Sequence, residues 1–110
     1  MSTSAAVIAK APLFDALGDA NRLRIVTRLC DRGPCSTSEF TRVIPVSRQA
    51  ATKHLLLLEA VGLVSSERHG RERIWRIQPK PLADASDYLT ALSKRWDNAI
   101  DRLRAYVEDE

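Results

Sequence analysis

The stretch 47–62, SRQAATKHLLLLEAVG, decides the fold of this 110-residue chain. Ser47 can cap a helix by accepting a hydrogen bond from a first-turn amide, and Gly62 can end it because glycine tolerates positive φ. The apolar residues 51, 55 and 58 fall at i, i+4 and i+7, on one inward face. A helix held by its apolar second half, with a polar beginning, is typical of one that enters the DNA major groove. An ordinary amphipathic surface helix is the alternative.

Two helices are predicted before this stretch. Residues 5–17 form a helix that we expect to be regular from about Pro12, because proline is tolerated in a first turn. Residues 20–31 repeat apolar side chains every three or four positions, with Asp19 or Asn21 as the N-cap. The pattern therefore predicts an α-helical beginning of the domain.

A short helix at 36–43 precedes the quoted stretch and completes a helix-turn-helix. Ser36 and Glu39 have the spacing of a capping box, in which each side chain bonds the other's backbone amide. Pro45 disfavours helical geometry at the residue before it, so an extended turn separates the two helices. Two short helices joined by a tight turn, the second with a polar beginning, predict a helix-turn-helix.

Residues 63–78 predict a hairpin with a cationic tip. Two short strands, 63–68 and 72–78, are joined by the turn His69-Gly70-Arg71, where glycine takes the backbone angles that other residues avoid. Such a tip beside a DNA-reading helix suits contact with phosphates or insertion into the minor groove. The alternative is a solvated hairpin whose charges keep its edge from aggregating.

Residues 82–107 predict one long helix, separated from the hairpin by Pro79 and Pro81. Its apolar side chains recur every three or four residues, as in a helix-pairing seam. This stripe consists of Leu82, Ala85, Leu89, Leu92, Trp96, Ala99, Leu103 and Tyr106. One small domain does not need so long a stripe, so we expect a symmetric dimer that pairs this helix with its mate, assisted by the first helix. The alternative is that the helix covers its own core.

Length and composition predict one globular domain over residues 1–110, mainly α-helical with a small β-hairpin. Positive charge is concentrated in residues 20–80, with twelve Lys and Arg against five Asp and Glu, whereas residues 81–110 hold four against seven. A basic middle is expected of a nucleic-acid-binding face, although a solvated basic surface is the alternative. No signal peptide and no run of about 18 apolar residues is found, so we expect a cytoplasmic protein without a membrane partner.

Three stretches together resemble the winged helix-turn-helix of ArsR-type bacterial repressors. LFDALGDANRLRIVTRL, at 13–29, is similar to the family's opening, where a D-x-x-R run starts the second helix. SRQAATKHLLLLEAVGLV, at 47–64, resembles the recognition helix with its His-Leu-x-x-Leu run, and RHGRERIWRI, at 68–77, resembles the wing. The likeness covers about residues 12–107. It implies a winged helix-turn-helix whose terminal helices form a dimer interface.

The resemblance implies DNA contact by the start of the recognition helix and by the wing. On the matching positions the contacting residues are Ser47, Arg48, Gln49, Thr52, Lys53 and His54, with Arg71 and Arg73 of the wing against the DNA backbone. The chemistry agrees, because arginine can pair bidentately with guanine and glutamine with adenine. For His54 the alternative is a buried, hydrogen-bonded core histidine. Leu56 stands where the family usually has a polar residue.

The family is best known for metal sensing, and this sequence departs from it there. Ser36 and Ser38 occupy the positions of the family's Cys-x-Cys pair, and hydroxyls are poor ligands for soft metals. The last helix offers Asp84 and Asp87 but no histidine for the family's other metal site. We therefore expect no metal and no cofactor.

Cys30 and Cys35 are the remaining candidates for a sensing site. They flank the Gly33-Pro34 break and could approach each other, and the nearby Arg28 and Arg32 could lower a thiol pKa. The alternative is two small buried hydrophobic residues. A disulfide would also need Cα atoms within about 7 Å.

These features predict a homodimeric, sequence-specific repressor that binds a palindromic operator in double-stranded DNA. An inducer, if one exists, would be a small molecule or an oxidant acting on the two cysteines. A winged-helix module that docks another protein through Leu56 and the hairpin is the alternative. We expect no enzyme, because the sequence shows no nucleophile-histidine-acid set, no paired carboxylates and no glycine-rich phosphate loop.

Overall fold

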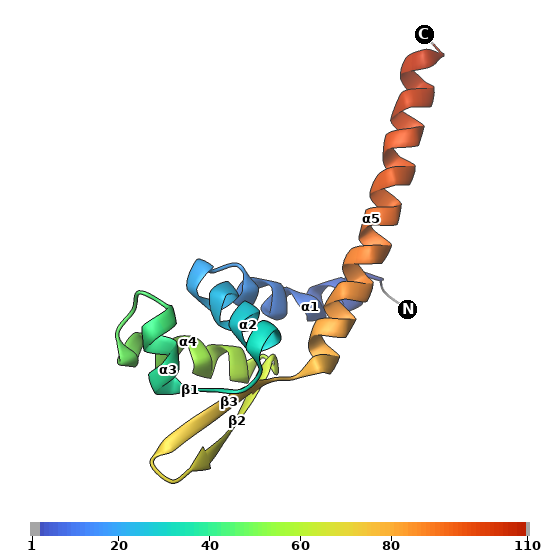
Figure 1. The fold of residues 1–110 in the computed structure, drawn as a ribbon. Coiled ribbons are helices and arrows are strands. Elements are labelled where there is room, and N and C mark those ends of the chain that lie inside the picture. Colours follow the sequence, from blue (N-terminus) through green and yellow to red (C-terminus); the bar gives the residue numbers. More distant parts are fainter. Residues whose placement is uncertain (1–2, 110) are drawn as a thin grey trace.

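The computed structural model describes residues 3–109, so residues 1, 2 and 110 of the predicted domain lie outside it. Within these residues the chain forms five helices and three short strands (Figure 1). The elements are α1 (Thr3–Leu17), α2 (Ala20–Arg32), β1 (Cys35–Ser36), α3 (Thr37–Val43), α4 (Arg48–Ala60), β2 (Val64–His69), β3 (Glu72–Ile77) and α5 (Pro79–Glu108).

Three helices begin at the caps that the sequence predicts. Asp19 caps α2 by accepting from the backbone N–H of Arg22, and Ser36 and Glu39 form the complete capping box of α3. Ser47 caps α4 by accepting from the N–H of Ala50 at 3.1 Å. Each cap satisfies an amide that would otherwise lack a partner, so each fixes where its helix starts.

The core lies where α2, α3 and α4 meet the sheet (Figure 1). Its largest fully buried side chains are Trp75, Phe40, Ile25, Leu29, Ile44, Leu55, Leu58 and Leu63. Trp75 also carries a polar atom into the core, and its Nε1 donates to the Thr37 hydroxyl at 2.8 Å. A buried indole needs such an acceptor, and this bond ties the wing to the start of α3.

The sheet contains one strand more than the predicted hairpin. β3 is the central strand of the order β1-β3-β2, and both of its neighbours run antiparallel to it. The added strand β1 has only two residues, with Cys35 paired to Trp75 and Ser36 paired to Ile74. Two residues are too few to show a period of two, so the sequence could not reveal this strand.

The first and last helices both start earlier than predicted, and the expectation that the first is regular only from about Pro12 is wrong. α1 runs unbroken from Thr3 through Pro12. The proline ring removes the backbone hydrogen bond to the carbonyl of Ile8, four residues back, yet the helix continues. α5 begins at Pro79 rather than at residue 82, because the missing N–H of proline costs nothing in a first turn.

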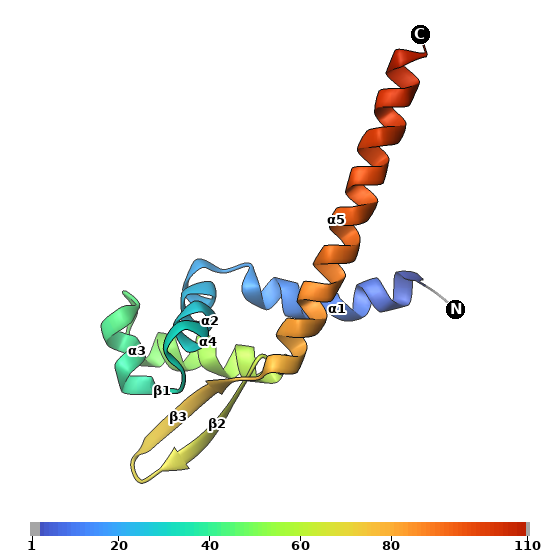
Figure 2. The same cartoon turned by 45° about the vertical axis from the view of Figure 1, so that its right-hand side comes forward.

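α5 leaves the body of the domain and projects away from it in both views (Figures 1 and 2). At its base Leu82 and Ala85 pack on the domain. Farther along, the apolar stripe is uncovered: Trp96, Leu103 and Tyr106 are 68%, 58% and 68% exposed. Among residues 3–109, none of the helices combines the length and the apolar character that a membrane span requires.

Candidate nucleic-acid interface

The inward face of α4 anchors the helix, and the polar side chains at its start face solvent. Ala51, Leu55 and Leu58 are completely buried, as the i, i+4, i+7 spacing predicts. The side chains of Gln49 and Lys53 are exposed and make no hydrogen bond or ion pair within residues 3–109. Their donors and acceptors are therefore available to a ligand that approaches the start of α4.

Arg48 is exposed but is already oriented by a bond to α3. Its Nη1 donates to the Ser38 hydroxyl at 2.6 Å, and that hydroxyl donates to Glu72 Oε1 at 3.2 Å. The chain of bonds therefore links α4, α3 and the wing strand β3. Neither Ser38 nor Glu72 is among the residues that the sequence singles out for DNA contact, because the bonded partners are distant in sequence.

Thr52 is half-buried, and its hydroxyl donates to the carbonyl of Arg48, one turn earlier, at 2.9 Å. Such a bond within the helix occupies the only donor of the side chain. The methyl group and the oxygen lone pairs of Thr52 stay free for contact.

His54 faces the start of α2. Its Nδ1 lies 3.4 Å from Arg22 Nη1 and 3.9 Å from Asp19 Oδ2, and its side chain is 20% exposed. Arg22 also donates from Nε to the carbonyl of Ala16 at 2.7 Å, so one guanidinium joins α1, α2 and α4. The bond from the Arg22 backbone N–H lowers the pKa of Asp19, and the charges of Arg22 and His54 act in the same direction. The alternative from the sequence is a buried, hydrogen-bonded core histidine; His54 is close to Arg22 but is only partly buried and lies outside the core cluster.

The wing separates its arginines into free and engaged ones. Arg68 and Arg71 are exposed and make no hydrogen bond or ion pair among the described residues. Arg73 instead lies over the ring of Trp75, with Cζ 5.7 Å from the ring centroid, and Arg76 is paired with Glu67. Cation–π contact holds a guanidinium close to the body of the domain. Arg71 is thus free to contact a ligand, and Arg68 is a further free cation that is not among the DNA-contacting residues expected from the sequence.

The two cysteines lie in different environments. Cys30 is exposed on α2, whereas Cys35 is buried on β1, and both are free thiols. Burial raises the pKa of the Cys35 thiol, and the opposing charge of Arg28 is the smaller influence. The expectation that nearby arginines lower this thiol's pKa is therefore wrong for Cys35. Arg28 is engaged elsewhere, because it donates to the carbonyl of Gly33 at 2.9 Å.

Ser36 and Ser38, which stand at the family's cysteine positions, both make hydrogen bonds that stabilise the fold. The Ser36 hydroxyl accepts from the N–H of Glu39 at 3.2 Å, which caps α3, and Ser38 bridges Arg48 and Glu72. Within residues 3–109, no three His, Cys, Asp or Glu side chains are grouped so that they could hold a metal ion.

Comparison with known proteins identifies the family. Residues 17–67 match a helix-turn-helix domain family. The chain is 33% identical over 97 residues to the HTH-type transcriptional regulator Rv2034 of Mycobacterium tuberculosis, covering 88% of this chain and 87% of that protein. The solved structure of an ArsR-like transcriptional regulator from Rhodococcus sp. RHA1 matches with a TM-score of 0.74 and 35% identity, over 90% of this chain and 92% of that chain. This chain belongs to the ArsR family.

Membership of the ArsR family makes the chain a DNA-binding transcriptional regulator with a winged helix-turn-helix fold, as predicted. A second relative is named as a repressor. It is the HTH-type transcriptional repressor SmtB of Mycobacterium tuberculosis, 32% identical over 88 residues, which cover 80% of this chain and 63% of that protein.

Proposed function

We propose that this ArsR-family regulator is a homodimeric repressor that binds an imperfect palindromic operator and does not respond to metals. The observation that carries the proposal is the division of α4 into a completely buried inward face and exposed polar side chains at its start. A helix of this kind can enter the major groove with its polar start while its buried apolar face keeps it attached to the domain.

Arg48 and Gln49 supply base recognition in this proposal. Arginine pairs bidentately with the O6 and N7 atoms of guanine, and glutamine with the N6 and N7 atoms of adenine. Lys53 and the wing residues Arg68 and Arg71 are free cations and would contact phosphates. Each neutralised phosphate releases counterions, so affinity should fall steeply with salt. His54 would not contact DNA itself; it would position α4 through its contact with Arg22 of α2.

The uncovered stripe of α5 supports a homodimer. Next to it, Phe14 and Leu17 of α1 form a shallow groove with Leu82 and Leu89 of α5. A second copy of the chain would cover the same surface on both partners, as a twofold interface requires. The dimer would then present two copies of α4 to half-sites about 34–36 Å apart on one face of the duplex.

Independence from metals is supported by the serines at 36 and 38. A thiolate binds soft metals strongly, whereas a hydroxyl that already caps a helix or bridges two side chains offers little. We expect zinc, cadmium and arsenite each to leave the affinity for operator DNA unchanged. A metal-induced loss of the DNA complex would contradict this part of the proposal.

The experiment that tests DNA recognition is a binding titration on the DNA upstream of the protein's own gene, followed by fluorescence anisotropy at two salt concentrations. The Arg48→Ala, Gln49→Ala double variant should lose roughly 10- to 1,000-fold in preference for the operator over random DNA, since each base contact contributes about 1–3 kcal/mol. The matched control is Arg95→Ala, which removes an exposed arginine from α5. Equal binding of the wild type to operator and random DNA would overturn the proposal.

A further inference from the structure

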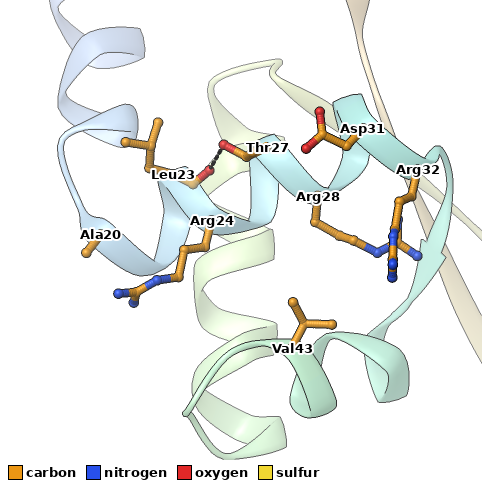
Figure 3. Close-up of a pocket in the computed structure, with 8 residues that line it drawn as sticks. All are labelled: Ala20, Leu23, Arg24, Thr27, Arg28, Asp31, Arg32 and Val43. Carbon is orange, nitrogen blue, oxygen red and sulfur yellow. Dashed lines mark hydrogen bonds between the residues drawn. The ribbon is translucent and has the colours of Figure 1, made fainter.

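An open groove between α2 and the end of α3 has no role in the proposed DNA contacts (Figure 3). Its volume of about 550 Å³ falls within the range of about 300–1,000 Å³ that is typical of small-molecule sites. Leu23 of α2 and Val43 of α3 line it and are 50% and 49% exposed. Two large apolar side chains, one from each wall, are thus left partly open to solvent.

The α2 wall of this groove carries a row of three arginines. Arg24, Arg28 and Arg32 lie four residues apart along α2, and all three line the groove. Like charges at this spacing repel and destabilise an isolated helix. Arg28 lies 3.9 Å from Glu39, which is outside the groove's lining, whereas Arg32 makes no hydrogen bond or ion pair with any of residues 3–109. Among the described residues of the lining, Asp31 is the one carboxylate beside the three guanidinium groups. The groove is therefore apolar and cationic at once.

We propose that this groove is the inducer site of the regulator and binds a small organic anion with an apolar body, such as an alkyl carboxylate. The apolar body would cover Leu23 and Val43, and the carboxylate would pair with the unpartnered Arg32. Guanidinium groups bind carboxylates strongly because two parallel N–H groups match two oxygens. A DNA phosphate would use the same charge, but it has no apolar part to cover the leucine and the valine.

The position of the groove connects it with the DNA-reading helix. Val43 is the last residue of α3, and only the turn of residues 44–46 separates α3 from the Ser47 cap of α4. Ser38, on the same short helix, holds Arg48. A ligand that wedges α3 away from α2 would therefore shift both the cap and the guanidinium of the recognition helix. This regulatory part rests on the proposed function.

Binding is tested first without DNA, by following amide NMR shifts and calorimetric heats of the full chain during titration with octanoate. Octanamide has the same apolar body without the charge, and inorganic phosphate has charge without the apolar body. We expect saturable octanoate binding that affects α2 and α3, with at least roughly tenfold weaker binding of both controls. Phosphate binding as strongly as octanoate would overturn the proposal and point to a surface for the DNA backbone.

Variants locate the site and separate it from DNA binding. Leu23→Glu and Val43→Glu place a carboxylate in the groove at exposed positions, and each should weaken octanoate binding by roughly tenfold or more. Leu56→Glu is the matched control, because Leu56 is 49% exposed on α4 and does not line the groove. Equal octanoate binding by all three variants would place the ligand elsewhere and overturn the site.

The regulatory part is then tested with the operator complex of the wild type. Octanoate should release the DNA from the wild type at concentrations that leave the Leu23→Glu complex intact. If octanoate occupies the groove while the operator complex is unchanged, the inducer role is overturned. If the protein shows no operator preference at all, the proposed function fails, whereas the groove is still judged by the titration without DNA.

Discussion

α4 and α5 carry apolar stripes of the same helical spacing, yet the chain covers only one of them. Leu55 and Leu58 of α4 are completely buried by α2, α3 and the sheet. Trp96, Leu103 and Tyr106 of α5 remain more than half exposed. An apolar stripe thus indicates that a helix will be covered, but it does not tell whether the cover comes from the same chain or from another molecule.

The largest effect is expected from a substitution in the buried apolar stripe of α4. Leu55→Ala should lower the free energy of unfolding by about 2–5 kcal/mol, because it leaves a cavity in the core. Leu103→Ala in α5, measured by urea denaturation at a protein concentration low enough for monomers, should cost less than about 1 kcal/mol. Equal losses for the two variants would show that the distal part of α5 is covered within its own chain.

The next effect concerns the uncovered stripe and tests the proposed dimer. The Trp96→Glu, Leu103→Glu double variant should weaken self-association by at least about 2 kcal/mol, or roughly 30-fold in Kd, because buried aromatic anchors dominate interfaces. Sedimentation over a range of concentrations measures the change. Leu56→Glu, which alters an equally apolar exposed residue of α4, should leave association intact. A wild type that stays monomeric at all concentrations would refute the dimer.

A smaller effect sharpens the account of the exposed beginning of α4. Ser38→Ala removes the hydroxyl that orients Arg48. We expect a loss of about 0.5–1.5 kcal/mol in operator binding, or roughly 2- to 12-fold, with unchanged self-association. Ser66→Ala is the control, since it removes a hydroxyl of β2 that bonds Glu59 near the end of α4 and does not touch the residues proposed to contact DNA. Unchanged or tighter operator binding by the Ser38 variant would show that this bond does not prepare Arg48 for DNA.

The smallest effect is a pH dependence at the contact between α2 and α4. The Asp19 pKa is lowered in the folded chain, so its charge contributes stability above the unfolded value of 3.8 and loses it as the pH falls through the lower folded value. Asp19→Asn keeps a good N-cap but removes the charge. Urea midpoints between about pH 6 and pH 2.5 should therefore fall less for the variant than for the wild type. Parallel curves would contradict this assignment.

Local chemistry explains which parts of the fold the sequence predicts. The caps Asp19, Ser36 and Ser47 each bond an amide three residues away, so their signal lies within one turn of sequence. The inward face of α4 follows from the period of the helix. The strand β1 has no such signal, because Cys35 and Ser36 are extended only through pairing with residues 74 and 75 of β3.

The candidate DNA-contacting residues also divide into those whose exposure the sequence predicts and those whose contacts it does not. Gln49, Lys53 and Arg71 are free, in keeping with a pattern that placed them on exposed surfaces. Arg73 has similar sequence surroundings to Arg71, but it packs on Trp75. Arg73 and Trp75 lie two residues apart in β3, so their side chains share one face of the strand, whereas Arg71 lies in the turn before β3 begins.

The sequence by itself determined the order of the helices, their caps, the glycine turns, the inward face of α4 and the family resemblance. These are consequences of spacing along the chain and of backbone preferences that act within a few residues. The tertiary structure alone decided the third strand, the bond from Arg48 to Ser38, the contact of His54 with Arg22 and the apolar, arginine-lined groove of α2 and α3. Each joins residues far apart in the chain, whose contacts depend on how whole elements pack and not on any local pattern.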